Sequence, residues 1–242
     1  MATLYLHPGL GTDVVLGARV TVAGEEARHA VSVARVRVGE RIAIGDGGGL
    51  VVWGPVVEAQ TTELTIQVDQ VEWEDQPRPE LWLAQALAKG DRDELAVQAA
   101  TELGVAGVIP WAADRSIARW EGPKVAKGRD RWTAIVREAS KQAIRPRVPV
   151  VGELATTKQL SALAGQLVVL EPGAATPLTE LALDAERVIL VVGPEGGISP
   201  HELATLEAAG ASLVHLGREV LRTSTAGPAA LAVLASRLGR WS

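Results

Sequence analysis

The segment Gly193–Gly197 places a glutamate among glycines directly after an apolar run of the chain. Ser199 and Glu202 follow it with the spacing of a helix N-cap and its N3 partner, and Pro200 occupies the first helical position, which favours proline. The loop is therefore predicted to join a buried strand to a helix, and its glycines let the main chain approach a ligand. The alternative is a tight turn without a ligand, which needs fewer glycines and gives Glu195 no role.

This glycine loop does not match the sequences that hold phosphate groups. It lacks the Gly-Lys-Ser/Thr of a P-loop and the Gly-x-Gly-x-x-Gly of dinucleotide-binding folds, and Glu195 would repel a phosphate. Metal chemistry is also unsupported, because the chain has no cysteine and its four histidines show no His-x-His or His-x-x-x-His spacing. We expect no metal, no disulfide and no thiolate nucleophile.

A second polar segment, His215–Gly227, follows another apolar run and again precedes a predicted helix. Small polar residues gather at the expected start of that helix, where backbone N–H groups have no partner within the helix. Thr223 or Ser224 is expected to cap it. Arg222 stands at the strand-to-helix junction, where it can reach a substrate. The alternative is a surface arginine beside an ordinary cap.

The scaffold for these segments is predicted from the alternation of apolar strands and helical stretches after Leu81. Asp91 and Glu94 form a capping-box pattern that opens the first helix. Strands are predicted at 81–88, 105–110, 167–170, 188–192 and 212–216, and helices at 91–103, 130–143, 200–209 and 224–238. This alternation predicts an α/β fold with a mainly parallel sheet and helices on both faces, and such sheets bind ligands at the carboxyl ends of their strands.

Residues 1–72 follow a different pattern, with short β segments and glycine-rich turns. Strands are predicted at 3–6, 19–22, 41–44, 50–57 and 64–68, with one helix near 24–34. The period-two alternation of the last strand and the turn cluster Gly45–Gly49 favour a small barrel. Residues 73–80 are acidic and polar with two prolines, and they form the predicted linker to a second domain at 81–242.

The charge of the chain is distributed unevenly. Its 242 residues carry a formal net charge of −5, which speaks against a general nucleic-acid binder. From Arg115 to Arg147, however, ten basic residues stand against three acidic ones. This stretch fits a localised contact with a polyanion, and it fits a solvated helix face equally well. No apolar run is long enough to cross a bilayer, no secretory signal is visible, and the lack of cysteine fits the cytoplasmic protein that we expect.

Both polar segments resemble one known family. GPEGGIS at 193–199 and HLGREVLRTSTA at 215–226 are similar to the 16S rRNA (uracil-N3)-methyltransferase family, which belongs to the SPOUT superfamily of knotted methyltransferases. Further similar stretches lie at 85–105, at 137–149 and in the N-terminal part around His29 and 43–49. The resemblance therefore covers nearly the whole chain.

The resemblance implies a SPOUT-type trefoil-knotted sheet, an N-terminal PUA-like β-barrel that binds RNA, and a homodimer. It also implies S-adenosylmethionine as cofactor, held in the knot. The matching positions are Leu170, Glu171, Gly193, Pro194, Glu195, Gly196, Gly197, Leu216, Gly217, Val220, Leu221, Arg222, Thr223, Ser224, Thr225 and Ala226. Ser224 stands where the family often has glutamate, so no carboxylate role is carried over to it. The basic N-terminus of the family is replaced here by Met1–His7.

The implied reaction is methylation of uracil N3 in 16S rRNA of the small ribosomal subunit. Because N3 carries a proton, the enzyme must stabilise the negative charge that spreads onto O2 and O4, and Arg222 is expected to do so. Glu138 is a candidate proton acceptor. The residues expected to contact RNA are Lys89, Arg115, Lys141, Arg145 and Arg147. The alternatives are another SPOUT RNA methyltransferase, with a ribose 2′-O or tRNA target, and a non-catalytic RNA-binding assembly factor.

Overall fold

The chain forms two compact units that interleave in sequence. The computed structural model describes residues 4–241. One unit holds the chain up to Gln76 together with Ser140–Val148, and the other holds Pro77–Ala139 and the chain from Pro149 onward. The sequence predicted two consecutive domains joined by a linker at 73–80. The assignment of Ser140–Val148 to the first unit was not anticipated.

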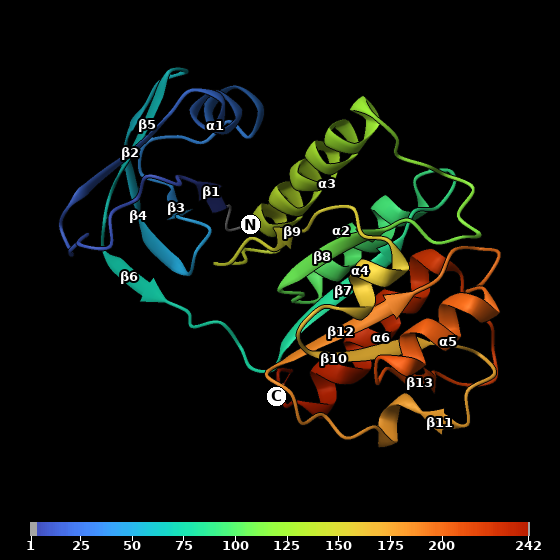
Figure 1. The fold of residues 1–242 in the computed structure, drawn as a ribbon. Coiled ribbons are helices and arrows are strands. Elements are labelled where there is room, and N and C mark those ends of the chain that lie inside the picture. Colours follow the sequence, from blue (N-terminus) through green and yellow to red (C-terminus); the bar gives the residue numbers. More distant parts are fainter. Residues whose placement is uncertain (1–3, 242) are drawn as a thin grey trace. The chain divides into compact units, whose positions relative to one another are not determined.

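The first unit is built on a six-stranded sheet (Figure 1). The strands are β1 (Leu4–Leu6), β2 (Arg19–Ala23), β3 (Arg41–Gly45), β4 (Leu50–Ala59), β5 (Glu63–Gln67) and β6 (Gln70–Trp73). Their order is β1-β3-β4-β5-β2, with β6 paired to β4, and only the β1–β3 pair is parallel. The predicted strands are confirmed within a few residues, although Thr3 lies outside the described residues. The sequence missed β6, which ends inside the predicted linker.

A short helical segment covers the core of the first unit. Helix α1 (Glu25–Arg28) continues into the π-helix η1 (His29–Val33), as predicted near 24–34. Leu64, Ile66 and Val68, the alternating positions of the last predicted strand, are all buried. They pack with Tyr5, Val22 and other buried apolar residues into one cluster.

The second unit contains a seven-stranded sheet in which every pair of neighbours is parallel. Its strands are β7 (Glu80–Ala86), β8 (Gly107–Trp111), β9 (Val150–Val151), β10 (Gln166–Leu170), β11 (Thr176–Pro177), β12 (Arg187–Val192) and β13 (Ser212–His215). The order is β11-β13-β10-β12-β7-β8-β9. The predicted parallel sheet is confirmed. The sequence missed β9 and β11, which have only two residues each and therefore no readable periodicity.

Helices lie on both faces of this sheet, as predicted. Figure 1 shows α4 (Thr157–Ser161) and α5 (Pro200–Ala208) on one side and α2 (Arg92–Glu102) and α6 (Thr223–Arg237) on the other. A short 3₁₀ turn, η2 (Leu178–Glu180), precedes β12. Helix α3 (Pro123–Gln142) starts seven residues before the predicted Asp130. Its Trp132 is fully buried and meets the ring of Trp120 edge to face, with centroids 5.4 Å apart.

The two predicted capping boxes have different outcomes. At α5 the Ser199 side chain accepts from Glu202 N and the Glu202 carboxylate accepts from Ser199 N, as predicted. At α2 the prediction is wrong. Asp91 has the left-handed φ of 59° and its side chain makes no capping bond, while the Glu94 carboxylate accepts from Arg131. The Asp93 carboxylate instead holds the segment that leads into α2, because it accepts from Ala88 N at 3.2 Å.

Candidate functional site

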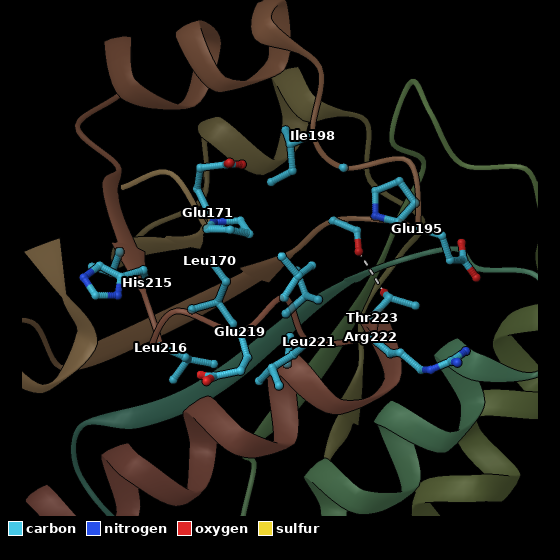
Figure 2. Close-up of a pocket in the computed structure, with 18 of the residues that line it drawn as sticks. Leu170, Glu171, Glu195, Ile198, His215, Leu216, Glu219, Leu221, Arg222 and Thr223 are labelled. Atoms are coloured by element: carbon cyan, nitrogen blue, oxygen red, sulfur yellow. Dashed lines mark hydrogen bonds between the residues drawn. The ribbon is translucent and has the colours of Figure 1, made fainter. Parts of the chain in front are cut away.

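Three neighbouring parallel strands end at one edge of the second sheet and open there into a cavity. Because β13, β10 and β12 are adjacent and parallel, the segments that follow them converge. They enclose a cavity of about 390 Å³ (Figure 2). Its lining residues are Arg92, Leu170, Glu171, Pro172, Val192, Gly193, Pro194, Glu195, Gly197, Ile198, Val214, His215, Leu216, Gly217, Glu219, Val220, Leu221, Arg222, Thr223 and Ala226.

Most of the predicted cofactor residues line this one cavity. Gly196, Ser224 and Thr225 are the three predicted positions that do not. The lining residues that the sequence missed include Arg92, which comes from α2, and Glu219, which lies inside the second polar segment but was not among the predicted cofactor positions. The spacing of Arg92 relative to the glycine loop gave no signal, because the fold alone brings α2 beside it.

Side chains from three elements hold the glycine loop in place. Arg92 Nη1 donates to Glu195 Oε1 at 2.9 Å, and Arg115 Nη1 donates to Gly196 O at 3.1 Å. Thr223 Oγ1 donates to Gly193 O at 2.8 Å, the bond that Figure 2 marks with a dashed line. Gly193 itself is tightly enclosed, since a Cβ atom there would lie 2.7 Å from Ile198 Cγ1. The loop therefore has a fixed course along the cavity wall.

The buried carboxylate of Glu202 supports the far end of that loop. Besides Ser199 N, it accepts from Asp114 N at 2.9 Å and from Thr157 Oγ1 at 2.8 Å. Ser199 Oγ in turn donates to Asp114 Oδ2 at 2.8 Å. These donors offset the cost of removing the carboxylate from water. The sequence identified Glu202 only as a helix cap, whereas the structure makes it the centre of a network that joins the segment after β8 to the starts of α4 and α5.

The second polar segment presents its main chain to the cavity. Within the described part of the chain, no backbone N–H or C=O of Gly217–Leu221 takes part in a hydrogen bond. Leu216 and Leu221 flank the cavity in Figure 2, with the Glu219 side chain between them. Unused main-chain donors and acceptors beside apolar side chains suit the edges and faces of a planar heterocycle.

The start of α6 differs from the prediction. Neither Thr223 nor Ser224 caps the helix, because its N-cap residue is Arg222, whose backbone is extended and whose side chain makes no capping bond. Thr223 is the first helical residue, and its hydroxyl also accepts from Gln85 Nε2 at 2.8 Å. Arg222 is exposed and lines the cavity, so its guanidinium is available to a ligand.

The charges around the cavity favour a cationic ligand over a phosphate. Three carboxylates, from Glu171, Glu195 and Glu219, stand against the guanidinium groups of Arg92 and Arg222. Arg92 is already paired with Glu195. The remaining carboxylates would repel a polyphosphate and attract a positive charge.

The residues predicted to contact RNA have different surroundings. Lys89 is exposed in the segment after β7, whereas Lys141 is buried in the first unit with Nζ 3.3 Å from Glu26 Oε2. The burial and pairing of Lys141 do not support its predicted RNA contact. Arg115 is exposed, but its guanidinium donates to the glycine loop. That arrangement points to a structural role for Arg115.

Two further predicted RNA contacts lie in the same segment as Lys141. Arg145 and Arg147 are both half-buried in the first unit. Arg147 Nε donates to Glu74 O at 2.9 Å, and its guanidinium lies over the ring of Trp73. Arg147 therefore also ties the segment 140–148 to the end of β6.

Glu138 is exposed on α3 and is not among the residues that line the cavity. Within residues 4–241, no group of three or more histidine, aspartate or glutamate side chains is arranged to hold a metal ion. In the same range no helix is long and apolar enough to span a membrane.

Comparisons with known proteins agree on one kind of protein. Residues 74–235 match the family model of an RNA methyltransferase domain, and residues 22–68 match that of an RNA methyltransferase PUA domain. The ribosomal RNA small subunit methyltransferase E of Mycobacterium tuberculosis is 41% identical over 234 residues, which cover 93% of this chain and 89% of the relative. That of Bacillus subtilis is 29% identical over 238 residues, which cover 88% of each chain.

A solved structure is similar over the full length. It is the ribosomal RNA small subunit methyltransferase E of Neisseria gonorrhoeae bound to S-adenosylmethionine, with a TM-score of 0.86 and 26% identity. The match covers 98% of each chain, so both units of the fold are shared.

Proposed function

Because the chain belongs to the ribosomal RNA small subunit methyltransferase E family, we propose that it methylates N3 of a uracil in 16S rRNA. It is an rRNA methyltransferase that depends on S-adenosylmethionine. The observation that carries the proposal is the cavity at the carboxyl ends of β10, β12 and β13, which is lined by both polar segments. The charges and hydrogen-bonding groups that line the cavity indicate which ligand it binds and what each lining residue does.

The cavity fits S-adenosylmethionine in charge and in main-chain chemistry. When bound, S-adenosylmethionine supplies a methyl group on a positively charged sulfonium sulfur, ready for in-line displacement. Glu171 and Glu219 make the cavity favourable for that positive charge. The unused backbone groups of Gly217–Leu221 would hold the adenine edge, with Leu216 and Leu221 against its faces. S-adenosylmethionine carries no phosphate, and the glycine loop lacks the phosphate-binding sequences.

Arg222 is proposed to act on the uracil. It lines the cavity and is exposed, so its guanidinium can face a base presented at the mouth. As N3 loses its proton, negative charge spreads onto O2 and O4, and a fixed cation beside these oxygens stabilises it. Glu138 lies outside the cavity lining, so we assign the proton to no residue of this chain and propose that positioning of the base contributes much of the rate.

The substrate uracil must be unpaired or extruded, because N3 lies on its Watson–Crick edge. We propose that Lys89, Arg145 and Arg147 contact the RNA backbone, and we leave out Lys141 and Arg115 because of their internal partners. We further propose that the protein acts as a homodimer on the small ribosomal subunit, in the cytoplasm. Arg145 and Arg147 belong to the same unit as the PUA domain match.

The decisive experiment is methyl transfer from labelled S-adenosylmethionine to small ribosomal subunits that lack their normal methylation. The RNA is then digested and the labelled nucleoside is identified by mass spectrometry. We expect label in 3-methyluridine. A 2′-O-methylated nucleoside would instead mean a related methyltransferase with another target. A protein that neither binds S-adenosylmethionine nor transfers label would be a non-catalytic RNA-binding factor.

A further inference from the structure

The hydroxyl of Thr223 is engaged on both sides within the second unit. Oγ1 donates to Gly193 O and accepts from Gln85 Nε2, both at 2.8 Å. A hydroxyl has one hydrogen and the Gly193 carbonyl can only accept, so the donor toward Thr223 must be the amide NH₂ of Gln85. The bonds therefore run in one direction, from Gln85 through Thr223 to Gly193.

Gln85 occupies a position where an apolar residue would suit stability better. Its side chain is fully buried near the end of β7, and its Nε2 also donates to Ala86 O at 3.2 Å. Its Oε1 is buried and has no partner among the described residues. A buried acceptor without a partner destabilises a fold, and an apolar side chain of similar size would avoid that cost. The stability of the sheet thus gives no reason for glutamine at position 85.

This chain of hydrogen bonds, the relay from Gln85 through Thr223 to Gly193, joins three elements that meet at the cavity. Gln85 is in register with Val192, the last residue of β12, and Gly193 follows directly. Thr223 lies 138 residues further along the chain than Gln85, at the first turn of α6 and next to Arg222. Figure 2 shows Thr223 next to Arg222, with the dashed line from its hydroxyl marking the bond to Gly193 O. One chain of bonds therefore fixes the glycine loop on one wall and the start of α6 on the other.

We propose that Gln85 and Thr223 are positioning residues that set the separation of these two walls and hence the placement of Arg222. The inference rests on the function proposed above and deepens it. Gln85 does not line the cavity, and the Thr223 hydroxyl has no hydrogen left to donate. Neither side chain is therefore a principal hydrogen-bond donor to the cofactor. Thr223, which the sequence assigned to cofactor binding, acts through the main chain of Gly193.

The test compares variants of the full-length protein by three measurements: the Kd for S-adenosylmethionine from calorimetry, the kcat for methyl transfer, and the Tm. Thr223→Val keeps the side-chain shape and removes both bonds, so we expect Kd to rise by about tenfold and kcat to fall by at least as much. Gln85→Met removes the first donor, and we expect a smaller change in the same direction. Thr223→Ser keeps the hydroxyl, and we expect its Kd and kcat to stay within about twofold of the wild type.

Thr101→Val is the matched control, because Thr101 is fully buried in α2 and its hydroxyl donates to Val97 O at 2.8 Å. It should lower the Tm and leave Kd and kcat unchanged. Wild-type values of Kd and kcat in both Thr223→Val and Gln85→Met would overturn the relay, even if the Tm falls. If Thr223→Val does not fold, the Kd and kcat of Gln85→Met alone test the proposal. A wild-type protein that neither binds the cofactor nor transfers methyl would refute the proposed function, a separate outcome from failure of the relay.

Discussion

Arg92 Nη1 lies 2.9 Å from Glu195 Oε1, although the two residues are 103 positions apart in the sequence. Arg92 opens α2, which follows β7, and Glu195 is the centre of the glycine loop after β12. Both line the cavity. The pair thus connects the loop to a helix outside the two polar segments, and it neutralises one of the three carboxylates that line the cavity.

Removal of Arg92 should affect ligand binding more than folding. Exposed ion pairs contribute at most about 1 kcal/mol to stability, so Arg92→Ala should change the free energy of unfolding by less than that. The loop loses an anchor, and we expect the Kd for S-adenosylmethionine to rise about threefold. Urea unfolding and calorimetric titration measure the two effects. Arg129→Ala is the control, because Arg129 forms an exposed pair with Glu153 and does not line the cavity. Equal Kd values for both variants would contradict an anchoring role of Arg92.

Arg222 should matter for the chemical step more than for cofactor affinity. Removal of one group that stabilises developing negative charge typically costs about 100-fold or more in rate. Arg222→Ala is therefore expected to lower the single-turnover rate by about that factor, with the Kd for S-adenosylmethionine within about threefold of wild type. Arg222→Lys keeps the charge without the planar fork and should recover part of the rate. Normal turnover in Arg222→Ala would remove this residue from the mechanism.

Glu202 should contribute strongly to stability. Glu202→Gln replaces one carboxylate oxygen by an NH₂ group, which then faces either the donors of Asp114 and Thr157 or the N–H of Ser199. We expect the free energy of unfolding to fall by about 2 kcal/mol. Glu207→Gln, on the exposed side of the same helix, is the control and should stay within about 0.5 kcal/mol of wild type. Chemical denaturation of both variants checks this difference, and similar values for the two would contradict a buried network around Glu202.

The alkaline stability of the protein should depend on Tyr5. Burial, aided by the charges of Glu26 and Glu40, raises the pKa of Tyr5 from its ordinary 10.0 to about 12. Because the folded state holds the proton more tightly, the contribution of Tyr5 is complete below about pH 10 and is lost as the pH rises toward 12. Tyr5→Phe should therefore lose less stability than wild type across this interval. Tyr5 is the single tyrosine of the chain, so tyrosinate absorbance reports its titration directly. Ionisation near pH 10 in the folded protein would contradict its burial.

Substitutions of Lys89 and Lys141 should have different effects, one on RNA binding and the other on stability. Lys141→Met leaves the Glu26 carboxylate without its ammonium partner, and loss of one member of a buried pair costs about 3 kcal/mol. Lys89→Ala should leave stability unchanged, weaken RNA binding and reduce the slope of log K against log salt by about one. RNA titrations at several salt concentrations, at a temperature where both variants are folded, measure the slopes. A reduced slope in Lys141→Met with unaltered stability would restore its predicted RNA contact.

Features formed by a few consecutive residues could be predicted from the sequence. The glycine loop and the Ser199 cap of α5 were readable because each feature lies within a few consecutive residues. The parallel strands were readable from their apolar runs, which are buried on both faces. By contrast, the capping box at α2 does not form: Asp91 has a left-handed backbone without a capping bond, and Glu94 is engaged by Arg131 from α3, a partner that no local pattern indicates.

Long-range partners account for most of what the sequence did not reveal. Arg92 and Gln85 reach the glycine loop or its supports only through the order of β7 and β12 in the sheet. The basic stretch was predicted as one surface feature, yet it divides between an exposed helix, a buried ion pair and main-chain contacts. A charge count cannot distinguish these surroundings, because each depends on which element packs against the side chain.

The interleaving of the two units has a consequence for synthesis on the ribosome. The first unit contains Ser140–Val148, so the nascent chain cannot complete it when the first 76 residues have emerged. Until then Glu26 lacks Lys141, and Trp73 lacks the guanidinium of Arg147. Domains generally fold as units during translation, in order of emergence. Here the last contacts of the N-terminal unit form only after Pro77–Ala139, the first segment of the second unit with β7, α2, β8 and most of α3, has been translated.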